Sequence, residues 1–358
     1  MKERLSQITF SIIMLIFWLA NCPSAVAQDI QYSQYNRTPI QLNPALTGHS
    51  MGKTRVLTAY RNQWSQFLRG DAYVSGFVSG DFNFQKDSLQ GFGIGVSLER
   101  DVAGELSFGD TAVKLSAAYQ RKVAGTNGND HRIFAGLGGG IVQRRIDLTN
   151  ARWPSQHDGN GGFDPTIIIE LPADFNSDFL FVDLNMGLMW QSTFKNGNRF
   201  FIGAAGHHIN KPNVSFFNGG IESDLTIRYA LHGGGEIHLG NKLTHNWSVL
   251  PSFLYLAQGE SNVLNLGGSV RKYLGSEVTH RFIEFGVLVR LGRNLSNARE
   301  VTAFVPSLIL NLKRFSVGLS VDVPTNELRQ VSGFNGAFEV SLGYLFGALS
   351  DSSVRSVW

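Results

Sequence analysis

Apolar and polar residues alternate with a period of two through most of the chain. Residues 334–346 place Phe, Val, Leu and Tyr on one face and mostly small or polar residues on the other, and residues 225–239 and 281–291 repeat the pattern. Successive side chains of a β-strand point to opposite faces, whereas a helix repeats every 3.6 residues. The pattern therefore predicts strands and fits no helix.

Fourteen segments carry this signal, each near or above the ~9–11 residues that a strand needs to cross a membrane. They are residues 53–64, 70–83, 90–100, 107–122, 131–145, 178–193, 199–209, 225–239, 245–256, 261–273, 281–291, 300–311, 314–323 and 334–346. A soluble β-sandwich alternates in the same way. The segment lengths, and second faces rich in Gly, Ser and charge, favour an all-β, transmembrane antiparallel β-barrel of 14 strands.

The lengths of the connections also alternate. Residues 145–177, 210–224 and 324–333 follow odd-numbered segments, and the connections after even-numbered segments are short. Long loops on one side and short turns on the other are typical of outer-membrane barrels. The pattern predicts long loops outside the cell and both termini in the periplasm.

Composition supports an exported membrane protein. Only 16% of residues are charged, against ~25% in soluble domains, and there are 40 glycines and 26 phenylalanines. No run after residue 27 is long and apolar enough for a membrane helix. The near-neutral chain has no basic tract, so we expect no nucleic-acid partner.

Residues 1–27 have the pattern of a signal peptide: Lys2 and Arg4, an apolar stretch, then Ala25-Val26-Ala27. Cleavage before Gln28 removes Cys22, the only cysteine, and leaves no thiol chemistry. An alternative is acylation of Cys22, because residues 19–22 loosely match a lipoprotein cleavage site.

Residues 28–52 predict an irregular N-terminal arm. Pro39 and Pro44 each remove a backbone donor, and Asn43-Pro44 followed by Gly48 is typical of turns. The arm's tyrosines and aliphatic residues need a surface, so we expect it to plug or line the barrel of residues 53–346. A tail, 347–358, follows on the periplasmic side.

Glycine recurs within two predicted strands, at Gly91, Gly93 and Gly95, and at Gly136 and residues 138–140. Glycine inside a strand marks a bend or the close approach of another backbone. These residues either make room for the arm or form barrel corners, and we favour corners.

The sequence QYSQY at 31–35, Asn43-Pro44-Ala45, and Tyr60-Arg61-x-Gln63-Trp64 together resemble the opening of the PorP/SprF family. The resemblance implies an outer-membrane protein of type IX secretion and gliding motility in Bacteroidetes-type bacteria. The signature positions, which are also candidate docking residues, are Gln34, Tyr35, Asn43, Pro44, Ala45, Tyr60, Arg61, Gln63 and Trp64.

Two interpretations of Arg61 and Trp64 stay open. They either hold the arm or form part of a docking rim. Alternatively, Arg61 pairs inside the barrel with a carboxylate such as Glu99, and Trp64 is an interface aromatic. We expect Asn43-Pro44-Ala45 to fix a turn rather than to contact a secreted protein.

No motif predicts catalysis, a cofactor or a metal. Residues 136–140 lack the last glycine of a nucleotide loop. His207, His208, His232 and His238 do not have metal-ligand spacing, so we expect them on the barrel wall or rim. Residues 158–164 faintly resemble a calcium loop but have Ile169 where an acidic ligand belongs.

The resemblance implies a non-enzymatic component that helps to deliver or anchor a secreted, adhesin-like surface protein. Its partners would be other type IX secretion subunits, that secreted protein and outer-membrane lipid. The apolar 145–177 loop would close the mouth or meet another protein. A passive channel or hydrophobic-ligand transporter would need an open lumen, and a barrel hydrolase would need a Ser/His pair within hydrogen-bond reach.

Overall fold

The computed structural model describes residues 29–68, 72–85, 89–149, 151–157, 162, 164, 167, 171–218, 223–240, 247–275, 281–293, 298–325 and 336–347. The predicted leader with Cys22, most of the possible calcium loop and nearly all of the tail lie outside these residues. Within the described residues, no helix is long and apolar enough to cross a membrane.

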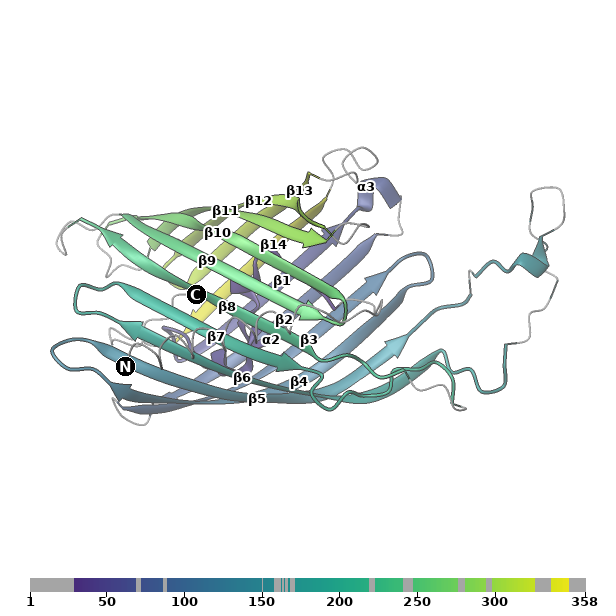
Figure 1. Ribbon diagram of the computed structural model, residues 1–358, viewed down its shortest axis with the longest axis horizontal. Coiled ribbons are helices and arrows are strands. Elements are labelled where there is room, and N and C mark those ends of the chain that lie inside the picture. The colour runs from purple at the N-terminus through teal and green to yellow at the C-terminus, as the bar shows by residue number, and fades with distance from the viewer. Residues whose placement is uncertain are drawn as a thin grey trace, which may run out of the picture.

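Fourteen antiparallel strands form a closed barrel (Figure 1), in which each strand pairs with its neighbours in sequence and β1 pairs with β14. The strands are β1 (Thr54–Gln63), β2 (Tyr73–Gln85), β3 (Gln90–Ala103), β4 (Phe108–Ala124), β5 (Asp130–Arg145), β6 (Asp178–Thr193), β7 (Arg199–His207), β8 (Arg228–Leu239), β9 (Trp247–Gln258), β10 (Ser261–Tyr273), β11 (Arg281–Arg293), β12 (Arg299–Leu312), β13 (Phe315–Pro324) and β14 (Ala337–Phe346). The predicted 14-stranded barrel is confirmed.

Side chains alternate across the barrel wall as the sequence predicts. In β6, Leu180, Val182 and Leu184 are exposed on the outer face, while Asp183 and Asn185, which alternate with them, are buried inside. An apolar exterior and polar interior suit lipid outside and a polar lumen inside. The barrel closes every strand edge along its paired length, which satisfies the backbone where lipid offers no hydrogen bonds.

Several predicted boundaries differ from the observed ones by one to three residues, and the start of β8 shows a cause. Residues 225–227 precede β8, because the chain here folds back on itself in an isolated bridge between Asn213 and Asp224. The Leu225 backbone N–H donates to the Pro212 carbonyl oxygen, and its side chain is buried among loop residues.

The two ends of the barrel differ. The β5–β6, β7–β8 and β13–β14 connections share one end, which we call the long-loop end (Figure 1). Two short helical segments also lie there, α3 (Ser65–Leu68) after β1 and η3 (Pro154–Gln156) after β5. The β2–β3, β4–β5 and β6–β7 turns are at the opposite, short-turn end.

Residues 29–53 form an arm inside the barrel, with three short helical turns, η1 (Tyr35–Arg37), α2 (Pro39–Leu42) and η2 (Pro44–Leu46). Ala45 and Leu46 are fully buried, and the largest apolar cluster joins arm residues to Phe134, Met189 and other wall residues. The core of this protein is therefore the contact between arm and wall.

Three of the strand glycines make room for the arm. A Cβ on Gly93 would lie 2.1 Å from the Thr47 carbonyl oxygen, and one on Gly136 would lie 2.3 Å from the Ala45 nitrogen. A Cβ on Gly95 would lie 2.9 Å from a methyl group of Ile40. For these three residues the favoured interpretation as barrel corners is wrong, because the arm occupies the space that a side chain would need, with its backbone at Gly93 and Gly136 and with side chains at Gly95.

We expect Gly136→Ala to displace the arm and destabilise the barrel by ~1–3 kcal/mol, as overpacking does. The measurement is the temperature at which the folded, fast-migrating form disappears on an SDS gel. Gly80→Ala is the matched control, since a Cβ there meets nothing within 4 Å. Equal melting of the two variants would contradict the packing argument.

Candidate functional site

The seam that closes the barrel holds a buried ionic network. Arg61 of β1 lies opposite Glu339 of β14, and its Nη1 is 2.5 Å from Glu339 Oε1. Its Nη2 is 2.9 Å from Asp322 Oδ2, which also accepts from Arg290 Nη1 at 2.6 Å. Arg61 is thus a charge in the lumen, as one of the two interpretations expected. The prediction that Glu99 is its partner is wrong. Glu99 instead faces Lys114.

The arm joins this seam network through its backbone. The N–H groups of Ser33 and Gln34 donate to the two carboxylate oxygens of Glu339, at 2.6 and 2.8 Å. The Ser33 hydroxyl donates to Asp322 at 2.5 Å, and the Gln34 amide donates to the Glu339 carbonyl oxygen at 3.3 Å. One buried carboxylate therefore fixes both the arm and the cation of β1.

Asn43-Pro44-Ala45 fixes a turn and also anchors it to the wall. The Asn43 Oδ1 accepts the Ala45 N–H at 2.9 Å, which caps η2. Its Nδ2 lies 3.1 Å from the Leu188 carbonyl oxygen and 3.0 Å from His232 Nε2. All three signature residues are buried, so they contact the barrel and present no free surface.

The other signature residues divide between lumen and exterior. Tyr35 lies in the arm–wall core, and the Gln63 side-chain oxygen accepts from Arg61 Nη2 at 3.0 Å. Tyr60 points outward and is 45% exposed. Trp64 has a left-handed backbone (φ 62°), and its ring packs edge-on against Tyr73 at 5.3 Å. Tyr60 and Trp64 suit the lipid face and the rim.

A second ionic cluster holds the first described residue of the arm at the long-loop end. Asp29 Oδ2 lies 2.6 Å from His208 Nε2, and His208 Nδ1 lies 2.8 Å from Asp183 Oδ1. Lys114 is 3.1 Å from Asp183, and Arg228 is 3.5 Å from Asp29. The sequence predicted only that His208 lies on the barrel wall or rim, and it did not predict these contacts.

Charge keeps this second cluster ionised. Burial would lower the pKa of His208, which follows β7, but the carboxylates of Asp29 and Asp183 raise it to about 9. Burial would raise the pKa of Asp29, but His208 and then Arg228 hold it well below its usual range. An imidazolium between two carboxylates thus ties the arm to the wall at neutral pH.

The end of the arm is held at the short-turn end. Arg55 of β1 and Asp81 of β2 form a buried pair at 2.5 Å, and Asp81 accepts the Gly48 N–H at 3.0 Å. Arg55 also donates to the carbonyl oxygens of Leu46 and His49. The arm is therefore bonded to the wall near its start, middle and end.

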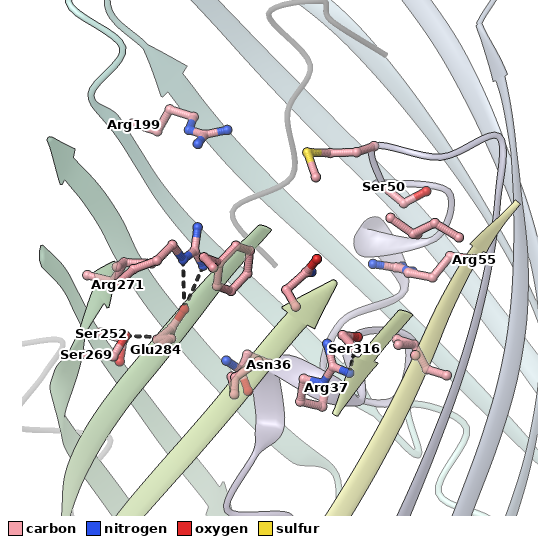
Figure 2. A pocket seen from close by; sticks show the side chains of 18 of the residues that line it. Asn36, Arg37, Ser50, Arg55, Arg199, Ser252, Ser269, Arg271, Glu284 and Ser316 are labelled. Carbon is pink, nitrogen blue, oxygen red and sulfur yellow. Dashed lines mark hydrogen bonds and ion pairs between the residues drawn. The ribbon is translucent and has the colours of Figure 1, made fainter. Parts of the chain in front are cut away.

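A partly open cavity remains between the arm and the wall formed by β7–β14 and β1. Its lining includes Arg37 of the arm and Arg271 with Glu284 on the wall (Figure 2). Met51, Asn311 and Leu345 place it toward the short-turn end.

Two Ser/His pairs lie within hydrogen-bond reach, a requirement for a barrel hydrolase. Ser192 Oγ is 2.7 Å from His131 Nδ1, and Ser248 Oγ is 2.9 Å from His238 Nδ1. Both serines are fully buried, so neither hydroxyl can reach a substrate in this structure. Among the described residues, no group of three or more His, Cys, Asp or Glu could hold a metal ion.

Removing the seam cation should loosen the arm. Arg61→Gln leaves Glu339 without its cation, and breaking a buried pair costs ~3–5 kcal/mol. We expect a loss of stability near the lower limit of this range, because Arg290 still neutralises Asp322. The measurement is thermal melting together with limited proteolysis of the arm. Arg145→Gln, at an exposed residue, is the control, and unchanged melting and cleavage of Arg61→Gln would contradict the role.

Raising the pH should loosen the start of the arm. A histidine with a pKa raised to about 9 contributes stability that is fully present below its ordinary value near 6.5 and is lost as pH rises through 9. A spin label on Gln31→Cys should therefore become more mobile between pH 7 and 10. Asp29→Asn removes one carboxylate and should weaken this transition and shift it to lower pH, whereas an identical transition would exclude His208 as its source.

Comparison with known proteins identifies a family and structures of similar fold. Residues 24–344 match the family described as "Type IX secretion system membrane protein PorP/SprF", and no curated protein matches the chain. The toluene transporter TbuX of Ralstonia pickettii is 11% identical (TM-score 0.43, covering 92% of this chain and 97% of that one). BamA of Haemophilus ducreyi lacking POTRA domains 1–3 is 10% identical (TM-score 0.40, 82% and 70% covered). These structures share the barrel architecture alone. The family match spans most of the sequence, and the chain belongs to the PorP/SprF family of type IX secretion system membrane proteins.

Proposed function

We propose that this protein is a non-enzymatic outer-membrane anchor of type IX secretion that holds a secreted, adhesin-like surface protein by protein–protein docking. The observation that supports it best is the filled lumen. An arm bonded to the wall near its start, middle and end occupies the space that a passive channel would leave open. The barrel then acts as a rigid base in the membrane rather than as a pore.

The long-loop end offers the surface for docking. Phe175 and Phe217 pair there in an isolated bridge, and Phe216 packs against Phe175 and Phe179. Phe217 remains 37% exposed. Aromatic side chains held on a rigid frame are frequent anchors of protein interfaces. In this proposal the long loops face outward, and the short turns and periplasmic side meet other secretion subunits.

The runner-up is a channel or hydrophobic-ligand transporter. The cavity at the short-turn end favours it, because part of the lumen is open there. The seam network and the Asp29–His208 cluster argue against it, since a moving solute would have to displace buried, charge-assisted bonds.

Affinity purification of the tagged protein from gently solubilised outer membranes, followed by mass spectrometry, tests the proposal. We expect a type IX secretion subunit or a large exported protein to co-purify. Phe217→Ser should reduce the exported partner strongly, since truncating an aromatic hot spot costs ~2 kcal/mol, roughly 30-fold in affinity. Phe315→Ser, at an exposed phenylalanine of the opposite end, should not.

A purified monomer that brings no such partner and conducts ions across planar bilayers would overturn the docking role in favour of the channel. Partner recovery unchanged by Phe217→Ser would move the docking surface away from the aromatic cluster at the long-loop end.

A further inference from the structure

Among the described arginines that line the cavity between the arm and the wall, one forms no ion pair. Arg55 pairs with Asp81, and Arg199 and Arg271 share Glu236 and Glu284. These pairs balance in charge. Arg37, on the arm, bonds only to hydroxyl groups among the described residues, and it faces the cavity beside Asn36 and Ser316 (Figure 2).

The Arg37 guanidinium is nine-tenths buried yet only partly used. Its Nε donates to Ser341 Oγ at 3.2 Å and its Nη2 to Ser316 Oγ at 2.6 Å. Its Nη1 donates to no described residue. Burial and the nearby Arg55 lower the pKa of Arg37 to about 10, and the more distant carboxylate of Glu284 offsets part of this shift, so the group is a cation at neutral pH. A buried charge without a partner is costly, and an anion at Nη1 would remove that cost.

Part of the lining is apolar. Leu250, Phe282 and Ile309 face the same space from β9, β11 and β12. An apolar patch beside a charged group that has no ion pair suits an amphiphilic ligand. The single uncompensated charge matches a monoanion, whereas a phosphate monoester carries ~1.5–2 negative charges at pH 7.

We propose that this cavity binds an amphiphilic carboxylate, with its head at Arg37 and its apolar body against Leu250, Phe282 and Ile309. Such a group comes either from a free fatty acid or from the C-terminal end of a polypeptide. The inference uses the purified barrel alone and does not depend on the docking role.

Titration calorimetry on the protein in lipid nanodiscs, with empty nanodiscs subtracted, tests it. The probes are octanoate and its neutral counterpart octanamide, and a short apolar peptide with a free or an amidated C-terminus. We expect at least one acid to bind tenfold or more tightly than its amide. Preference for octanoate identifies a free amphiphile as the source, and preference for the peptide acid alone identifies a chain end.

Two variants test whether the acid group binds at Arg37. Arg37→Gln removes the cation and should abolish the preference for the acid. Ser316→Asp keeps Arg37 but supplies an internal carboxylate beside Nη2, and it should abolish the preference while the arm stays bound. Arg121→Gln, at an exposed residue, should bind as the unchanged protein does. Equal binding of acid and amide, or a preference that survives both site variants, would overturn the proposal.

Discussion

The buried carboxylate of Glu339 links the two features on which this structure depends. It accepts from Arg61 across the strand pair that closes the barrel, and from the backbone N–H groups of Ser33 and Gln34 in the arm. Such charge-assisted bonds are strong in a site that water does not reach. Closure of the barrel and insertion of the arm are therefore coupled through one side chain.

The lumen wall is shaped to receive this arm. The arm has little regular structure of its own, with helical turns of three or four residues, so it depends on the wall for its conformation. The wall supplies glycines where the arm backbone approaches and polar side chains where it needs hydrogen-bond partners. The proposed anchoring role rests on this filled interior together with the family membership.

The arginines around the cavity fall into two groups, those with an ion-pair partner and Arg37, which has none among the described residues. Around the cavity, Arg55, Arg199 and Arg271 each pair with a carboxylate from a neighbouring strand. These pairs join neighbouring strands across the lumen wall. Arg37 departs from that pattern, and the departure lies where the lumen stays open.

The sequence by itself determined the barrel. Period-two alternation located all 14 strands, and the alternating lengths of the connections separated the two ends, because both signals are local along the chain. The QYSQY arm, Asn43-Pro44-Ala45 and Tyr60–Trp64 indicated the family for the same reason. Only the tertiary structure decided what these residues touch. Arg61 meets Glu339, 278 residues away, His208 meets Asp29, and Gly136 faces Ala45 across the lumen. Barrel closure and insertion of the arm bring these residues together, and neither leaves a periodic trace in the sequence.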